Sequence, residues 1–395
     1  MATAVLDIDL QMLPPVITGL ERYSKAYALI RLNGQPIGKT YLTVSNGQIS
    51  GVDLRAAALQ CAGWNLGEKW LHQYLDWDEL GPKAFIPPKA TVAVCTRDRP
   101  EDIRRCLDAL MLLPDDGQEV LVIDNCPSTD ETQRIVESYS SVRYIREDRP
   151  GSSAARNRAL REAQHEIVAF TDDDATPDPG WLRALLRNFE HPRVLCVTGQ
   201  VMPLELENEA QEWFESYSPL GRGFKRIVFD GIQHNRFRVA PIGVSANMAI
   251  RRSVLDRPGA FDEVLGVGTP TRCGEDHDLF SRILASGYQI VYDPSALSWH
   301  RHRRTWEDMR KTLFSYGVGV YAFWTRCLVV EKDLAVLQLP WGWLLNEQLP
   351  SLFCSILRRP GSTPLDLLLA ELRGCILGPW FYFISRKQSM LQKQR

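Results

Sequence analysis

Short apolar runs alternate with amphipathic stretches from residue 90 onward, and this alternation predicts a parallel sheet flanked by helices. Buried strands are expected at TVAVCT, EVLVID, VRYIRE, EIVAFTD and VLCVTG. Pro100 suits the first position of the helix after the first strand. The inward face of that helix is predicted to carry Ile103, Cys106, Leu107, Leu110 and Met111. Ser128 and Glu131 have the spacing of a capping box for the next helix.

Two further helices complete the alternation. One is expected to open near Ser152, and the other starts at Asp178-Pro179, where Asp178 would cap it. The second helix is predicted to turn Trp181, Leu182, Leu185 and Phe189 inward. Together these elements predict a doubly wound α/β domain, in which ligands bind beyond the carboxyl ends of the strands.

Residues 1–88 show a different pattern. The runs AYALIRL and TYLTVS flank NGQPIGK, which predicts a β-hairpin, and a helical stretch follows from Asp53 to about Leu75. The proline-containing segment FIPPK, residues 85–89, marks the boundary with the α/β domain. We expect residues 1–88 to form a small α+β appendage. The N-terminal stretch MATAVLDIDLQML lacks the basic region of a secretory signal, and none is expected.

Residues 305–395 are apolar, aromatic and edged with Lys or Arg, which predicts a helical C-terminal region. Asp366, Glu371 and Arg373 make its last segment a poor spanning helix, because charges at bilayer depth are expensive. These helices either pack on the catalytic domain as core or lie in a membrane interface. In the second case, the basic tail RKQSMLQKQR would lie near anionic headgroups, and a lipid-linked acceptor would suit it.

Composition narrows the class of protein. The formal charge of −2 over 395 residues argues against a general nucleic-acid binder, because no pervasive basic field would hold phosphate backbones. Nine cysteines without a C-x-x-C pair indicate reduced thiols in a cytosol rather than disulfides or a zinc site. The expected location is therefore cytoplasmic, with peripheral contact at the inner face of the membrane if the helices of 305–395 are interfacial.

Acidic residues collect where the predicted strands end. Asp98 and Asp124 each follow a strand, and Asp172, Asp173 and Asp174 close the run EIVAFTD. Three adjacent carboxylates repel one another unless a cation or a proton offsets them. A helix cap would need only one aspartate, and Asp178 already supplies it. Hard carboxylate oxygens suit Mg²⁺ or Mn²⁺, and such an ion could bridge the phosphates of a nucleotide.

Six stretches in order resemble family 2 glycosyltransferases of the inverting, GT-A type. They are TVAVCTRDRP, VLVIDNCPSTD, PGSSAARNRAL, FTDDDATPDPGWL, GVSANMAIRR and GEDHDLFSRILASGY, and they span about residues 90–304. The resemblance implies a GT-A sheet over 89–304 and a D-x-D metal motif at Asp172 and Asp174. Asp173 then falls in the variable middle of that motif, on the nucleotide-sugar side.

The resemblance also implies nucleotide-sugar contacts. Thr96, Arg97 and Asp98 match the first nucleotide loop, although the family usually shows Asn where Asp98 stands, and Asp98 could also cap a helix. Asp124 and Asn125 fall where the family has two acids that read the base. The amide can donate and accept, so uracil stays open and a UDP-sugar is favoured. Arg156 could favour an anion at a helix N-terminus, or together with Arg158 form a solvated face.

The transfer step needs a base near the acceptor hydroxyl. The Glu-Asp pair of the family matches Glu275 and Asp276, with Asp276 as the base; the alternative is that first-turn acids only favour the helix dipole. In SWHRHRRT, two histidines at i and i+2 of an extended segment point the same way. The resemblance implies that one histidine completes the metal site, His300 first and His302 in reserve. The alternative is a cationic loop that faces the diphosphate.

The expected function is transfer of a sugar from a nucleotide-diphosphate donor to a carbohydrate or lipid-linked acceptor, with Mn²⁺ or Mg²⁺ as cofactor. Residues 204–238 are expected on the acceptor side, where aromatic side chains either stack on sugars or pack an amphipathic helix. Two alternatives stay open: a sugar nucleotidyltransferase, disfavoured because CTRDRP lacks glycine, and a catalytically silent scaffold that binds partners. A dehydrogenase is disfavoured because no G-x-G-x-x-G follows a strand.

Overall fold

The computed structural model describes residues 2–75, 86–359 and 361–393. Its largest sheet has the order β10-β14-β11-β13-β9-β6-β7-β8, with β12 added on β14. The strands β6 (Ala90–Thr96), β7 (Glu119–Asn125), β8 (Val142–Glu147) and β9 (Ile167–Asp172) are parallel neighbours. The other strands are β10 (Ala175–Pro177), β11 (Val194–Pro203), β12 (Ile227–Phe229), β13 (Asn247–Arg251) and β14 (Gln289–His300). The antiparallel β13 separates β9 from the parallel pair β11 and β14.

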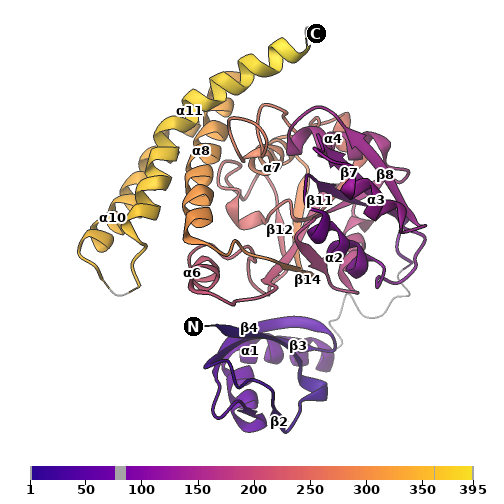
Figure 1. Ribbon diagram of the computed structural model, residues 1–395, viewed down its shortest axis with the longest axis vertical. Coiled ribbons are helices and arrows are strands. Elements are labelled where there is room, and N and C mark those ends of the chain that lie inside the picture. The colour runs from indigo at the N-terminus through magenta and orange to yellow at the C-terminus, as the bar shows by residue number, and fades with distance from the viewer. Residues whose placement is uncertain (1, 76–85, 360, 394–395) are drawn as a thin grey trace.

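Helices cover both faces of this sheet (Figure 1). Alternate residues of β6 enter two different cores: Val92 and Val94 pack with α2 (Pro100–Leu110) and α5 (Trp181–Leu186), and Ala93 packs with α4 (Ser152–Glu162) and α7 (Glu275–Ala285). Side chains of a strand alternate between faces, so continuous apolar strands bury both. A further helix of this domain, α3 (Glu131–Glu137), packs beside α2. The doubly wound α/β prediction is therefore confirmed.

Three local predictions are wrong. Met111 lies beyond the end of α2 and is 39 % exposed, because the inward face ends with Leu110. Ser128 does not cap α3; its amide and hydroxyl both donate to Asp98 Oδ1, each over 2.8 Å. Asp178 does not cap α5 either. Its Oδ1 accepts from the amide of Gly180, and its Oδ2 pairs with Arg31. Ser128 and Asp178 are therefore both bonded to groups other than those of the predicted caps.

The N-terminal residues form a lobe of their own (Figure 1). Strands β1 (Thr3–Asp9), β3 (Lys25–Leu32) and β4 (Gln35–Thr43) make a sheet in which β3 and β4 pair antiparallel, as the hairpin prediction required. Helix α1 (Gly51–Tyr74) packs on it, and β2 (Val16–Ile17) pairs with β5 (Ile49–Ser50). Phe85 of the expected boundary segment lies outside the described residues. The lobe contacts the larger domain through Arg31–Asp178 and Tyr27–Glu215.

The C-terminal helices α8 (Trp306–Val330) and α11 (Leu365–Lys393) run side by side (Figure 1). Between them lie α9 (Gln338–Trp343), a π-helical turn (Leu344–Gln348) and α10 (Leu349–Ile356). Glycines bring the two long helices together: a Cβ on Gly317 would overlap the backbone of α11, and one on Gly374 would overlap that of α8. By length and composition, α8 and α11 could each cross a membrane, but the core helix of a soluble protein passes the same test.

Candidate active site

Two carboxylates and an imidazole meet at the end of β9. Asp172 closes the strand, Asp174 lies in the turn to β10, and the pairing of β10 with β14 sets His300 opposite Ala175. One ligand atom from each of Asp172, Asp174 and His300 lies within 4.8 Å of the others. This donor set of hard carboxylate oxygens and one imidazole nitrogen fits Mn²⁺. Mg²⁺, which prefers oxygen, would be held mainly by the two carboxylates. The structure therefore brings together the two predicted aspartates and the preferred histidine.

The repulsion within the triple aspartate is offset by arginine. Arg99 Nη1 lies 2.9 Å from Asp173 Oδ1 and 3.2 Å from Asp174 Oδ2. Burial opposes the ionisation of Asp174, yet His300, Arg99 and Arg303 hold its pKa well below the ordinary value. Arg99 and Arg303 are not among the predicted site residues. The signal for Arg99 is its place in the first loop, TRDRP, directly before the helix-opening proline.

Asp173 is not part of the candidate metal-binding group formed by Asp172, Asp174 and His300, called the metal group below. It is buried, accepts a 2.7 Å hydrogen bond from Thr96 Oγ1, and pairs with Arg99. Burial raises the pKa of Asp173 to about 6, against the pull of Arg99 and Thr96. Thr96 and Asp173 thus hold each other inside the fold, so both support the site rather than line its surface.

The two residues predicted to read the base, Asp124 and Asn125, have different surroundings. Asn125 donates from Nδ2 to the carbonyl of Arg149 over 2.7 Å, and its Oδ1 accepts from the amide of Gly151 over 2.9 Å. Its amide is therefore occupied by the loop before α4. Asp124 accepts from the Tyr144 hydroxyl at Oδ2 over 3.0 Å, while its buried Oδ1 has no partner among the described residues. Burial raises the pKa of Asp124 to about 6.

In the predicted first nucleotide loop, Arg97 and Asp98 are exposed, whereas Thr96 is buried. Asp98 has a left-handed backbone, with φ of 52°, and its carboxylate ties the loop to Ser128 rather than to a helix. Arg97 reaches only a 3.7 Å contact with Asp98, so its guanidinium projects into solvent beside Asp98. The contact between Asp98 and Ser128 thereby links the segments that follow the parallel strands β6 and β7. Asp124 lies at the same end of the sheet.

Arg156 joins the metal group to α7. Its Nη1 lies 2.8 Å from Glu275 Oε1, and its Nη2 lies 3.5 Å from Asp172 Oδ1. Glu275 also accepts from Ser152 Oγ over 3.1 Å. Burial raises the pKa of Glu275 despite the facing arginine. Arg156 is buried, so it does not belong to a solvated helix face. Arg158 does: its side chain is partly exposed and pairs with Glu162 on the same helix.

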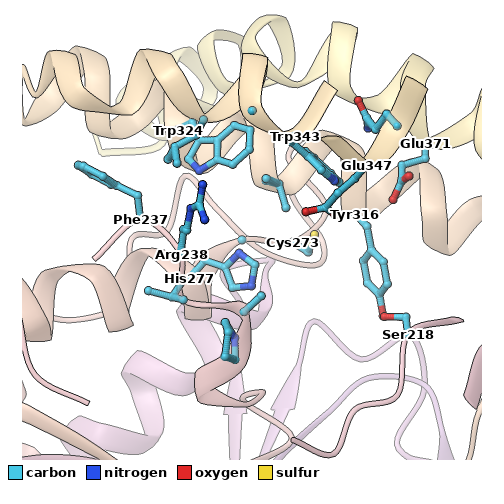
Figure 2. A pocket seen from close by; sticks show the side chains of 18 of the residues that line it. Ser218, Phe237, Arg238, Cys273, His277, Tyr316, Trp324, Trp343, Glu347 and Glu371 are labelled. Atoms are coloured by element: carbon cyan, nitrogen blue, oxygen red, sulfur yellow. The ribbon is translucent and has the colours of Figure 1, made fainter. Parts of the chain in front are cut away.

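Asp276 faces the other way. It lines a cavity of about 740 Å³ between α7, the loop 217–244 and the C-terminal helices, and this cavity contains none of Asp172, Asp174 and His300 (Figure 2). Asp276 is half-buried, and its Oδ1 accepts from the amide of His277, the one hydrogen bond to its carboxylate within the described residues. The neighbouring acids therefore serve two compartments: Glu275 binds Arg156 beside the metal group, and Asp276 opens to the cavity.

His302 is separate from the metal group. It follows the end of β14 and is 2 % exposed, and its Nε2 lies 3.1 Å from Glu215 Oε2. The strand stops at His300, so the i, i+2 rule does not carry on to His302. Glu215 of α6 (Glu209–Tyr217) also binds the Tyr27 hydroxyl and Lys39 Nζ of the N-terminal lobe. The aromatic residues of α6 pack inward in part, with Phe214 buried and Trp213 stacked on Tyr217.

Comparison with known proteins agrees with this geometry. Residues 91–258 match the family "Glycosyl transferase family 2". The pre-mycofactocin glycosyltransferase of Mycobacterium tuberculosis is 30 % identical over 232 residues, which are 58 % of this chain and 46 % of that protein. The glycosyltransferase AglE of Haloferax volcanii is 25 % identical over 287 residues, which are 70 % of this chain and 87 % of AglE. The chain thus spans about half the length of the first of these relatives.

A solved structure shares the fold. The mannosyltransferase PcManGT from Pyrobaculum calidifontis, in complex with GDP-Man and Mn²⁺, superposes with a TM-score of 0.52 at 20 % identity, over 80 % of this chain and 95 % of its own. The fold is therefore that of GT-A glycosyltransferases. The match over residues 91–258 assigns this α/β part of the chain to glycosyltransferase family 2.

Proposed function

We propose that this protein is an inverting, metal-dependent glycosyltransferase that moves a sugar from a nucleoside diphosphate, UDP, to a hydroxyl acceptor. The observation that carries the proposal is the division of the Glu275–Asp276 pair, because Glu275 pairs with Arg156 beside the metal group while Asp276 lines the cavity. Inversion requires the acceptor hydroxyl and the departing diphosphate on opposite faces of the anomeric carbon, so a donor held beside Asp172 and Asp174 and an acceptor held beside Asp276 would meet at that carbon. Both UDP and inversion are proposals about this chain.

The donor side would hold a divalent ion through Asp172, Asp174 and His300. When bound, such an ion neutralises the charge of the departing diphosphate as a Lewis acid. Arg156 is buried at 2.8 Å from Glu275 and 3.5 Å from Asp172, so it fixes the spacing between the metal group and α7. Arg303, 3.6 Å from Asp174, adds positive charge on the same side.

On the acceptor side, the Asp276 carboxylate takes the proton of the acceptor hydroxyl. The hydroxyl oxygen forms its bond to the anomeric carbon from the face opposite the diphosphate, and the carbon–oxygen bond to the diphosphate breaks with its electron pair. Asp276 suits this role because it is half-buried and ion-pairs with no described residue, so its carboxylate is free to receive a proton.

The free oxygen of Asp124 supports uracil as the base. Uracil offers one N–H donor on its pairing edge, and Asp124 has one unpartnered oxygen, Oδ1, because Oδ2 already accepts from Tyr144. Guanine presents two adjacent donors that would engage both oxygens of a carboxylate. Asn125 takes no part in this choice, because both ends of its amide bond the backbone of residues 149–151.

We also propose the division 1–88, 89–304 and 305–395, with a carbohydrate or lipid-linked acceptor and a peripheral membrane contact through the last region. Exposed apolar side chains support the membrane contact: Ile376 and Trp380 of α11 are 78 % and 65 % exposed, and Arg386 and Lys387 follow them. An amphipathic surface of this kind with basic residues favours an anionic lipid surface.

The test uses two variants with different expected losses. Asp276→Asn should bind UDP with Mn²⁺ like the wild type and lose about 100-fold to 10,000-fold of sugar transfer, the usual contribution of a general base. Asp174→Ala should weaken UDP binding only when Mn²⁺ is present. Calorimetry and product analysis by NMR would measure both, with exposed Asp256→Asn as the matched control. Transfer by Asp276→Asn at the wild-type rate, or product with a retained anomeric configuration, would contradict the proposal.

A further inference from the structure

The cavity beside Asp276 has walls from distant parts of the chain. The loop 217–244 forms one side, α7 contributes Asp276 and His277, and α8 to α11 form the other (Figure 2). Its volume of about 740 Å³ lies within the roughly 300–1,000 Å³ of small-molecule sites. The C-terminal helices, which lie outside the matched range 91–258, therefore line one side of the cavity that the proposed base faces.

One end of the cavity offers donors. Figure 2 shows Arg238 and Trp324 at this end, with Phe237 beside them. The buried indole Nε1 of Trp324 has no hydrogen-bond partner among the described residues. Arg238 is exposed, and no ion pair joins it to an acid in the described part of the chain. An unsatisfied buried N–H and an uncompensated guanidinium on one wall favour an acceptor group that is negatively charged.

The other end offers acceptors. Glu347 and Glu371 lie there with Tyr316, well apart from Arg238 in Figure 2. Glu371 is buried, and its Oε2 accepts from the Tyr217 hydroxyl over 3.3 Å. Burial, with help from Glu347, raises the pKa of Glu371 to about 7. A carboxyl group that is partly protonated at neutral pH can both accept from and donate to hydroxyl groups, which suits a sugar.

A second tryptophan, Trp343, lies between the donor end, where Trp324 stands, and the acceptor end. Trp343 meets Trp324 edge to face, with ring centroids 5.7 Å apart. Both rings line the cavity, and His277, next to the proposed base, lies opposite them in Figure 2. Indole faces are apolar platforms on which the C–H face of a sugar ring packs, while polar groups around them fix its orientation.

We propose that this cavity binds the acceptor, and that the acceptor is a saccharide bearing an acidic group, a carboxylate or a phosphate. The acidic group would lie against Arg238 and Trp324, the hydroxyls against Glu347 and Glu371, and the ring on the tryptophans, beside Asp276. This inference rests on the proposed glycosyl transfer for the identity of the ligand as the acceptor. It makes the C-terminal helices part of the acceptor site rather than a scaffold.

Binding can be measured without turnover. Methyl glucuronide and methyl glucoside share one ring and differ only in the carboxylate, so their affinities for the full chain with Mn²⁺ and UDP isolate the acidic group. We expect the glucuronide to bind at least tenfold more tightly. Arg238→Gln should bring the ratio of the two affinities toward one, whereas Arg55→Gln, an exposed substitution on α1, should keep it. Glucose 6-phosphate compared with glucose repeats the test with a phosphate.

The outcomes separate this inference from the proposed function. Equal binding of the charged and neutral saccharides, or an unchanged ratio in Arg238→Gln, would overturn the acidic acceptor even if the enzyme transfers sugar to another molecule. Preferential binding of the charged saccharide would support it even if the proposed donor is wrong, because no donor is turned over. Tighter binding of octyl than of methyl glucuronide would assign the acidic saccharide to a lipid-linked source, and equal binding to a soluble one; either supports the proposal.

Discussion

Asp124 and Asn125 occupy adjacent positions at the end of β7, and their surroundings give them different roles. The amide of Asn125 holds the loop before α4 through two backbone bonds. Asp124 keeps one oxygen without a partner in the described part of the chain. A buried acceptor without a partner is costly, so a ligand that supplies the missing N–H recovers that cost on binding. In the proposed donor site, Asp124 would therefore be the residue of this pair that contacts the base.

The pKa of Asp124 predicts a pH dependence of base binding. Burial raises the pKa to about 6, so the carboxylate is charged at pH 7.5 and mostly protonated at pH 5. The charged form accepts the uracil N–H more strongly than the neutral acid does, and at pH 5 only about a tenth of the carboxyl groups are charged, so the affinity for uridine should fall by about tenfold across that range. Uridine lacks phosphates, so NMR titration reads the base alone. Asp124→Asn should bind weakly at both pH values; a wild-type affinity that rises toward pH 5 would contradict the assignment.

The residues that could be predicted from the sequence are those fixed by short motifs. Asp172 closes a strand and Asp174 follows it in the turn, and the resemblance to the family added His300; the structure brings the three together through the pairing of β10 with β14. Arg99 and Glu215 could not be found in this way, because their partners lie 74 to 188 residues away and only the folded chain sets those pairs. The same long-range bonds redirected Ser128, which the capping-box spacing had assigned to its own helix.

At the scale of elements, Glu215 links the N-terminal lobe to the segment after β14. It binds Tyr27 Oη over 2.6 Å and His302 Nε2 over 3.1 Å, both buried, and the partly exposed Lys39 Nζ over 2.9 Å. Tyr27→Phe should lower the free energy of unfolding by about 1.5–3 kcal/mol, the value of a hydrogen bond to a charged group. Chemical denaturation measures this. Tyr41→Phe is the matched control, since its ring packs on Tyr27 and is half exposed. Equal losses in both variants would contradict a role for the Tyr27 hydroxyl.

The pairing of α8 with α11 depends on close backbone approach. A Cβ on Gly374 would overlap the carbonyl oxygen of Phe314 in α8, so Gly374→Ala should force the helices apart and cost about 1–3 kcal/mol, as overpacking does. Gly342→Ala in α9 is the control, because nothing lies within 4 Å of its added Cβ. There, the loss of glycine flexibility in the unfolded chain should leave stability equal or slightly higher. Thermal unfolding compares the two; an unaffected Gly374→Ala would mean that the contact adjusts freely.

Over the whole molecule, the order of elements was readable from the sequence, but the placement of the C-terminal helices was not. Strand and helix patterns gave the doubly wound sheet and the hairpin because each has a local period. Whether α8 and α11 cover the protein or a membrane depends on which faces meet, and glycine contacts such as Gly317 against α11 decide that only in three dimensions. The result is one wall of the cavity beside Asp276, with the outer faces of α10 and α11 still exposed.

That outer face allows the proposed membrane contact to be tested on the intact protein. Burying a large apolar side chain contributes about 1.5–3 kcal/mol, so Ile376→Glu with Trp380→Glu should weaken binding to vesicles of anionic and zwitterionic lipid by more than about 100-fold. Ile232→Glu is the control, since Ile232 is 90 % exposed but belongs to the loop after β12. Co-sedimentation measures the bound fraction. If the wild type stays in the supernatant with anionic vesicles at low salt, residues 305–395 serve the cavity alone, and the acidic saccharide reaches it from solution.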